Sequence, residues 1–118
     1  METNEAVQRL SALAQEGRLS VFRMLVRAGE SGLPAGEIAR AAGVPANTLS
    51  AQLNLLVSAG LVTRRRDGRS IVYTADYAGM SELILHLMED CCQGRAEVCR
   101  PVAEAAGRCR PQPAQGNA

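Results

Sequence analysis

The four cysteines of this 118-residue chain all lie at or after position 91, at Cys91, Cys92, Cys99 and Cys109. A disulfide framework would spread its cysteines to join distant segments, whereas this cluster is typical of a single site. The N-terminus shows no basic segment followed by an apolar run, so we expect no secretory signal and a reducing cytoplasm with free thiols. Free thiols bind soft ions or act in redox chemistry, and the cysteines alone leave both open.

The basic residues are the second group that could do chemistry. All 13 are arginines, and the segment from Arg40 to Ser70 holds five of them with a single acid, Asp67, although the formal net charge of the chain is only +1. A basic segment in a nearly neutral protein can bind a polyanion such as nucleic acid. Exclusive use of arginine is also what a GC-rich genome produces, so the arginine content alone does not decide the function.

The spacing of apolar residues predicts the elements that position these groups. Apolar positions recur at helical spacing, among them Ile38 and then Leu49, Leu53 and Leu56, which we expect to point inward. Gly43 and Gly60 are suited to end helices. We expect helices over about 4–15, 19–26, 35–42 and 48–59, with a turn at 44–47. The two short helices around that turn are typical of a helix-turn-helix.

Strand-forming residues follow, on both sides of Asp67-Gly68, and predict a hairpin over 61–74. A two-residue turn at Asp67-Gly68 would pair Arg66 with Arg69, which places like charges opposite each other. We expect this tip to be solvated or to bind an anion. Residues 77–90 then predict a final amphipathic helix that packs on its own domain or on a second copy of the chain.

Three segments carry a resemblance to a known family, and they are LSALAQEGRLSVFRMLVRAG, AGEIARAAGVPANTLSAQLNLLVSAGLVTRRRDGRSIVYTAD and EDCCQGRAEVC. They resemble the ArsR/SmtB family of metalloregulatory repressors, and within it the arsenite-responsive members with a vicinal cysteine pair at the end of the last helix. The resemblance runs from about Leu10 to Cys99. It implies a mainly α winged helix-turn-helix fold with a small β-hairpin as its wing. It also implies a homodimer with a C-terminal dimerisation helix, which represses without inducer and releases DNA when inducer binds.

The resemblance further implies which residues bind double-stranded operator DNA. The second helix of the motif enters the major groove, where Thr48, Ser50 and Gln52, taken to lie on one side of it, would meet base edges. The family usually carries His where this chain has Gln52, a departure that allows a different base preference. The wing lies along the phosphate backbone. Its candidate cations are Arg64, Arg65, Arg66 and Arg69.

The cysteine segment implies As(III) as inducer, with Sb(III) as a second candidate, bound by Cys91, Cys92 and Cys99. Three soft thiolates suit trivalent arsenic, because its lone pair occupies the fourth direction. Cys109 is a weaker candidate ligand. Zinc is a rival, but the usual C-x₂₋₄-C pairs are absent. A thiol redox switch, in which the cysteines oxidise, remains the alternative function.

Length and composition set the remaining expectations. At 47% hydrophobic and 3% aromatic residues, the chain suits one helical domain over residues 1–100, followed by a flexible tail over 101–118. The long uncharged stretch from Ala41 to Thr63 carries too many polar groups to span a membrane. The sole histidine, His86, has no evident Cys partner and the chain lacks C-x-x-C, so we expect neither an enzyme nor an organic cofactor.

Overall fold

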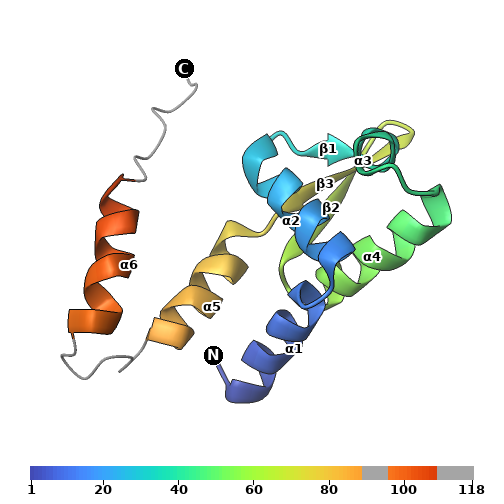
Figure 1. Ribbon diagram of the computed structural model, residues 1–118. Helices are drawn as coiled ribbons and strands as arrows, with labels where there is room; N and C mark the ends of the chain where they lie inside the picture. The colour runs from blue at the N-terminus through green and yellow to red at the C-terminus, as the bar shows by residue number, and fades with distance from the viewer. Residues whose placement is uncertain (89–95, 109–118) are drawn as a thin grey trace. The chain divides into compact units, whose positions relative to one another are not determined.

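The computed structural model describes residues 1–88 and 96–108, and it divides between His86 and Leu87 into two compact units. The elements are α1 (Thr3–Leu13), α2 (Glu16–Ala28), β1 (Leu33–Pro34), α3 (Ala35–Ala42), α4 (Ala46–Ser58), β2 (Val62–Asp67), β3 (Ser70–Ala75), α5 (Tyr77–Met88) and α6 (Ala96–Arg108) (Figure 1). Within the described ranges, no helix is long and apolar enough to cross a membrane.

Helices α3 and α4 form the predicted helix-turn-helix. Helix α3 has the predicted bounds, and Gly43 follows it in the left-handed conformation, with φ of +70°, which a residue without a β-carbon adopts at little cost. Helix α4 begins at Ala46, two residues before the predicted start. The Leu49 amide already donates to the Pro45 carbonyl at 3.0 Å, so Ala46 and Asn47 belong to the first helical turn and not to the connecting turn.

The sheet has one more strand than the sequence predicted. Strands are ordered β1-β3-β2 and are antiparallel, and β1 pairs Leu33 with Tyr73 and Pro34 with Val72. A two-residue strand carries no alternating pattern, so its position depends on tertiary pairing and not on local sequence. We call the β2–β3 hairpin, residues 62–75, the wing.

The predicted register of the wing is wrong. Asp67 pairs with Ser70 and Arg66 with Ile71, so Gly68 and Arg69 form the two-residue turn. Gly68 has φ of +65°, which places the glycine at a turn position that requires positive φ. The Asp76 amide extends the same register by donating to the Leu61 carbonyl at 2.8 Å. This register avoids the opposition of Arg66 and Arg69.

The core of the first unit lies between the helix-turn-helix, α2 and the sheet, and it is mostly aliphatic, with Phe22 and Tyr73 as its aromatic members. Its fully buried members come from each of these elements, and they include the inward leucines predicted for α4. They are Val21, Leu25, Ile38, Leu49, Leu53, Leu56, Leu61 and Val62. Burial of each such side chain contributes roughly 1.5–3 kcal/mol, so the core fixes how α4 is held.

Helix α5 begins at Tyr77 as predicted, whereas the predicted end at Asp90 lies outside the described residues. Its Leu83 is 4% exposed and packs within its own unit, while Ile84 and Leu85 are 44% and 68% exposed. The apolar residues of α5 therefore divide between an inward and an outward side, and only the outward side is free to meet a second copy.

Helix α6 runs across the boundary expected at residue 100. We expected a flexible tail from position 101, but residues 101–108 continue the helix, with Pro101 inside it. A proline there removes one backbone donor, yet the flanking Ala, Glu and Arg residues favour helix. Residues 109–118, the remainder of the expected tail, lie outside the described part of the chain.

Candidate nucleic-acid interface

Helix α4 presents an outer face of small and polar residues. The core leucines occupy one side, and the opposite side carries exposed residues at helical spacing, which are Asn47, Ala51, Asn54 and Ser58. We call these four residues the outer face of α4. Because successive helical residues differ by about 100°, Thr48 and Ser50 point roughly 200° apart and flank this face on opposite sides. The expectation that Thr48, Ser50 and Gln52 share one side is therefore wrong.

The three predicted helix residues also differ in exposure. Thr48 and Ser50 are exposed, whereas Gln52 is half-buried and its Oε1 has no hydrogen-bond partner within the described structure. Its amide group lies against the start of α2, where a β-carbon added to Gly17 would come within 2.5 Å of Gln52 Nε2. The structure thus holds Gln52 beside α2 and leaves Thr48 and Ser50 at the surface.

Two of the wing arginines lie on the same side of the sheet as α4. Side chains alternate along a strand, so Arg64 and Arg66 share the face of buried Val62. The Arg64 guanidinium reaches α4 and donates from Nη1 to Asn54 Oδ1 at 3.3 Å. The outer face of α4 therefore adjoins Arg64, and Arg66 follows on the same face of the strand, an arrangement suited to a duplex whose bases and phosphates lie side by side.

Arg65 points the other way. Its guanidinium donates to Thr74 Oγ1 at 3.3 Å and to the Ser31 carbonyl at 3.1 Å, which ties the wing to the segment between α2 and β1. The remaining wing cation, Arg69, is exposed in the turn. The structure thus separates the four predicted arginines into two on the α4 side, one on the far side and one at the tip.

Asn54 is the residue that the sequence reasoning missed. It lies seven residues after Asn47, and helical spacing counted from the core leucines places both opposite Leu49, Leu53 and Leu56. That count was available from the sequence. Its hydrogen bond to Arg64 depends on the tertiary position of the wing and left no local signal.

Known proteins share this arrangement of a helix-turn-helix and a wing. A family model described as a helix-turn-helix domain matches residues 13–65. The chain is 40% identical over 75 residues to the "Putative arsenical resistance operon repressor ArsR" of Halobacterium salinarum, and the matched region spans 64% of this chain and 57% of that relative. A homodimeric winged helix-turn-helix DNA-binding domain from Mycobacterium bovis, described as a possible ArsR-family transcriptional regulator, is similar at 30% identity, with 75% of this chain and 82% of that chain covered and a TM-score of 0.60.

The chain belongs to the ArsR family of winged helix-turn-helix regulators. HlyU from Vibrio cholerae is similar at 30% identity over 77% of this chain and 99% of that chain, with a TM-score of 0.60. The transcriptional repressor BigR from Xylella fastidiosa is similar at 31% identity over 76% and 89%, with a TM-score of 0.58. The winged helix-turn-helix prediction is confirmed, and membership of the ArsR family indicates a DNA-binding transcriptional regulator and not an enzyme.

The cysteines predicted to bind an inducer in this ArsR-family chain fall largely outside the described residues. Cys91, Cys92 and Cys109 lie there entirely, while Cys99 lies near the start of α6, on a segment whose backbone alone is described at that position. Among the residues that the structure does describe, no three His, Cys, Asp or Glu side chains gather in a group that could hold a metal ion. The three-thiolate site therefore remains a sequence prediction.

Proposed function

We propose that this ArsR-family chain is a cytoplasmic transcriptional repressor that binds operator DNA as a homodimer and releases it when As(III) binds Cys91, Cys92 and Cys99. The observation that carries the DNA-binding part is the adjacency of α4 and the wing, in which Arg64 contacts Asn54. Polar groups on a protruding helix can read base edges, and neighbouring guanidinium groups can bind phosphates. Thr48 and Ser50 flank the outer face of α4, and Arg66 and Arg69 supply further positive charge.

The homodimer is supported by α5. Ile84 and Leu85 are large apolar residues left exposed on the first unit, and burying them against a second copy would remove apolar surface from water. The similar domain from Mycobacterium bovis is described as homodimeric. A dimer would place two copies of α4 on one duplex, at half-sites about 34–36 Å apart.

The As(III) response is supported by the donor set and by one relative. Three thiols within nine residues of sequence offer soft ligands to a thiophilic ion, and the relative from Halobacterium salinarum is named for arsenical resistance. Sb(III) has the same ligand preference and is a second candidate inducer. If the ion binds DNA-free protein more tightly than DNA-bound protein, it weakens DNA binding by the same factor, typically 5- to 150-fold.

A thiol redox switch is the second candidate function. The adjacent Cys91–Cys92 pair could oxidise, and one of the similar structures is that of reduced HlyU from Vibrio cholerae. In this case oxidation, and not ion binding, would change DNA affinity.

One experiment separates these functions. A duplex that binds the purified protein is selected from a random library, and its dissociation constant is measured by fluorescence anisotropy at fixed salt. Arsenite is then added in the presence of a thiol reductant. Peroxide is added to a parallel sample that contains neither arsenite nor reductant. Release by arsenite under reducing conditions supports the As(III) sensor, and release by peroxide alone supports the redox switch. Failure to select any preferred duplex would reject sequence-specific repression.

A further inference from the structure

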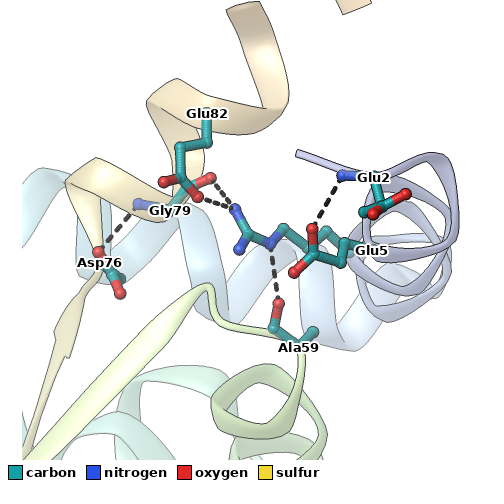
Figure 2. Close-up of polar contacts among 7 residues, drawn as sticks. Glu2, Glu5, Ala59, Asp76, Gly79 and Glu82 are labelled. Atoms are coloured by element: carbon teal, nitrogen blue, oxygen red, sulfur yellow. Dashed lines mark hydrogen bonds and ion pairs between the residues drawn. The ribbon is translucent and has the colours of Figure 1, made fainter. Parts of the chain in front are cut away.

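The turn that ends α4 is contacted at three successive carbonyls. The Ala59 carbonyl accepts a hydrogen bond from Arg9 Nε at 3.0 Å, and the Leu61 carbonyl accepts one from the Asp76 amide at 2.8 Å. Between them, the Gly60 carbonyl lies directly against Gly79 of α5. Helices α1 and α5 together therefore hold the C-terminal end of α4, and Figure 2 draws the hydrogen bond at the Ala59 carbonyl beside Gly79 and Glu82 of α5.

Arg9 makes most of these contacts from α1. Besides the Ala59 carbonyl, its Nη1 donates to the Gly79 carbonyl at 2.6 Å and to Glu82 Oε1 at 3.1 Å. The Arg9 side chain is 13% exposed, whereas that of Glu82 is 60% exposed. An ion pair with so exposed a partner contributes little, so the two backbone carbonyls are the contacts that fix the guanidinium. A cation at the end of α4 also interacts favourably with the helix dipole.

Two glycines allow α5 to approach the same turn without an intervening side chain. Gly60 has φ of +84°, and the hydrogen bonds from Gly60 to Val57 and from Leu61 to Leu56 close the end of α4 around it. A β-carbon on Gly79 would overlap the Gly60 carbonyl oxygen. Backbone therefore meets backbone, and a displacement of α5 at this point has no flexible side chain to absorb it.

We propose that Arg9 is a positioning residue for DNA binding, which fixes the end of α4 relative to α5 and so sets where the outer face of α4 is presented. The inference rests on the proposed function, because it assigns Arg9 a role in DNA binding by α4. In a homodimer, a small rotation of α4 in each subunit changes the separation of the two helices, which must match one turn of DNA. Arg9 thereby affects binding to paired half-sites more than binding to a single one.

The test compares paired and single half-sites in the full-length protein. Arg9→Met keeps the length of the side chain but removes every donor, and Glu82→Gln is the control, because it removes only the exposed ion pair. We expect Arg9→Met to weaken binding to the paired site by about tenfold or more, and to the single half-site by less than about threefold. A series of spacers, each one base pair longer or shorter, should show a shifted or broadened optimum for Arg9→Met and an unchanged one for Glu82→Gln.

A merely structural role predicts a different result. Loss of folded protein would weaken binding to both sites by the same factor and leave the preferred spacing unchanged, and that outcome would overturn the inference, as would unchanged binding to both. If Arg9→Met does not fold by circular dichroism, the same comparison is made with Arg9→Lys, which retains the charge but not the planar set of donors. Wild-type protein that selects no duplex would instead contradict the proposed function itself.

Discussion

Asn54 of α4 and Arg64 of β2 are joined by a hydrogen bond from Arg64 Nη1 to Asn54 Oδ1, 3.3 Å long, at the point where α4 meets the wing. The bond occupies one oxygen of an exposed amide and leaves its NH₂ group as a donor. It also orients a guanidinium that would otherwise have several rotamers. Helix and wing are thus linked within the surface proposed to contact DNA.

Replacing Asn54 should alter sequence preference. We expect Asn54→Ala to reduce discrimination at one base pair of each half-site by about 1–3 kcal/mol, because a base-edge contact is lost there. The measurement is a repeat of the duplex selection, with affinities for single-base variants of the selected site. Ser81→Ala, a change at an exposed position of α5, is the control. An unchanged preference would remove Asn54 from base reading.

The wing arginines should differ in how much each contributes to the salt dependence of DNA affinity. Arg66→Ala and Arg69→Ala should each lower the slope of log affinity against log salt by about one, because each removes a phosphate contact, and should do so equally on all sequences. Arg65→Ala should leave the slope unchanged, since its guanidinium is engaged by Ser31 and Thr74. Binding titrations at several salt concentrations decide this. A lower slope for Arg65→Ala would mean that its intramolecular contacts give way to phosphate.

A negative charge introduced on the outward side of α5 should have a different effect from one introduced on its inward side. Leu85→Glu places the charge at the outward side and should convert the dimer to folded monomers with weaker operator binding, because an unpaired charge is costly in an apolar contact. Leu83→Glu places it in the interior and should unfold the protein. Analytical ultracentrifugation and circular dichroism distinguish the two. A Leu85→Glu protein that remains dimeric would locate the dimer contact elsewhere.

The cysteine variants test the inducer site. Serine is close in size to cysteine, but its hydroxyl stays protonated and is a harder ligand. Cys91→Ser, Cys92→Ser and Cys99→Ser should each leave DNA binding intact and abolish release by arsenite, while Cys109→Ser should have little effect. Arsenite titration of preformed DNA complexes under reductant is the measurement. Full response of Cys99→Ser together with loss in Cys109→Ser would reassign the third ligand.

The sequence predicted the elements that carry strong periodicity and missed those that depend on pairing. The stripe of Ile38, Leu49 and Leu53 identified the helix-turn-helix, because burial of those side chains and helical spacing are the same signal. The register of the wing could not be read in this way. The register depends on which turn position requires the positive φ of Gly68. It also depends on the hydrogen bond from the Asp76 amide to the Leu61 carbonyl, which joins residues 15 positions apart.

The candidate site was predicted by residue type more accurately than by geometry. The wing arginines were identified from their number, but strand alternation and the Ser31 carbonyl distinguish Arg65 from its neighbours. Gln52 was selected for its polar amide, yet the absence of a side chain at Gly17 gives that amide a place beside α2. In both cases the deciding contact lies on another element, more than 30 residues away in the chain.

The alternation along β2 also limits how the wing can change in length during evolution. A single residue inserted between Val62 and Arg64 would exchange the faces of the strand, and would turn Arg64 and Arg66 away from α4 while bringing Arg65 toward it. Two residues inserted in each strand would preserve the faces and extend the wing by about 7 Å. Insertions that keep binding should therefore come in even numbers, so the wing can lengthen along a phosphate strand only in steps of two residues.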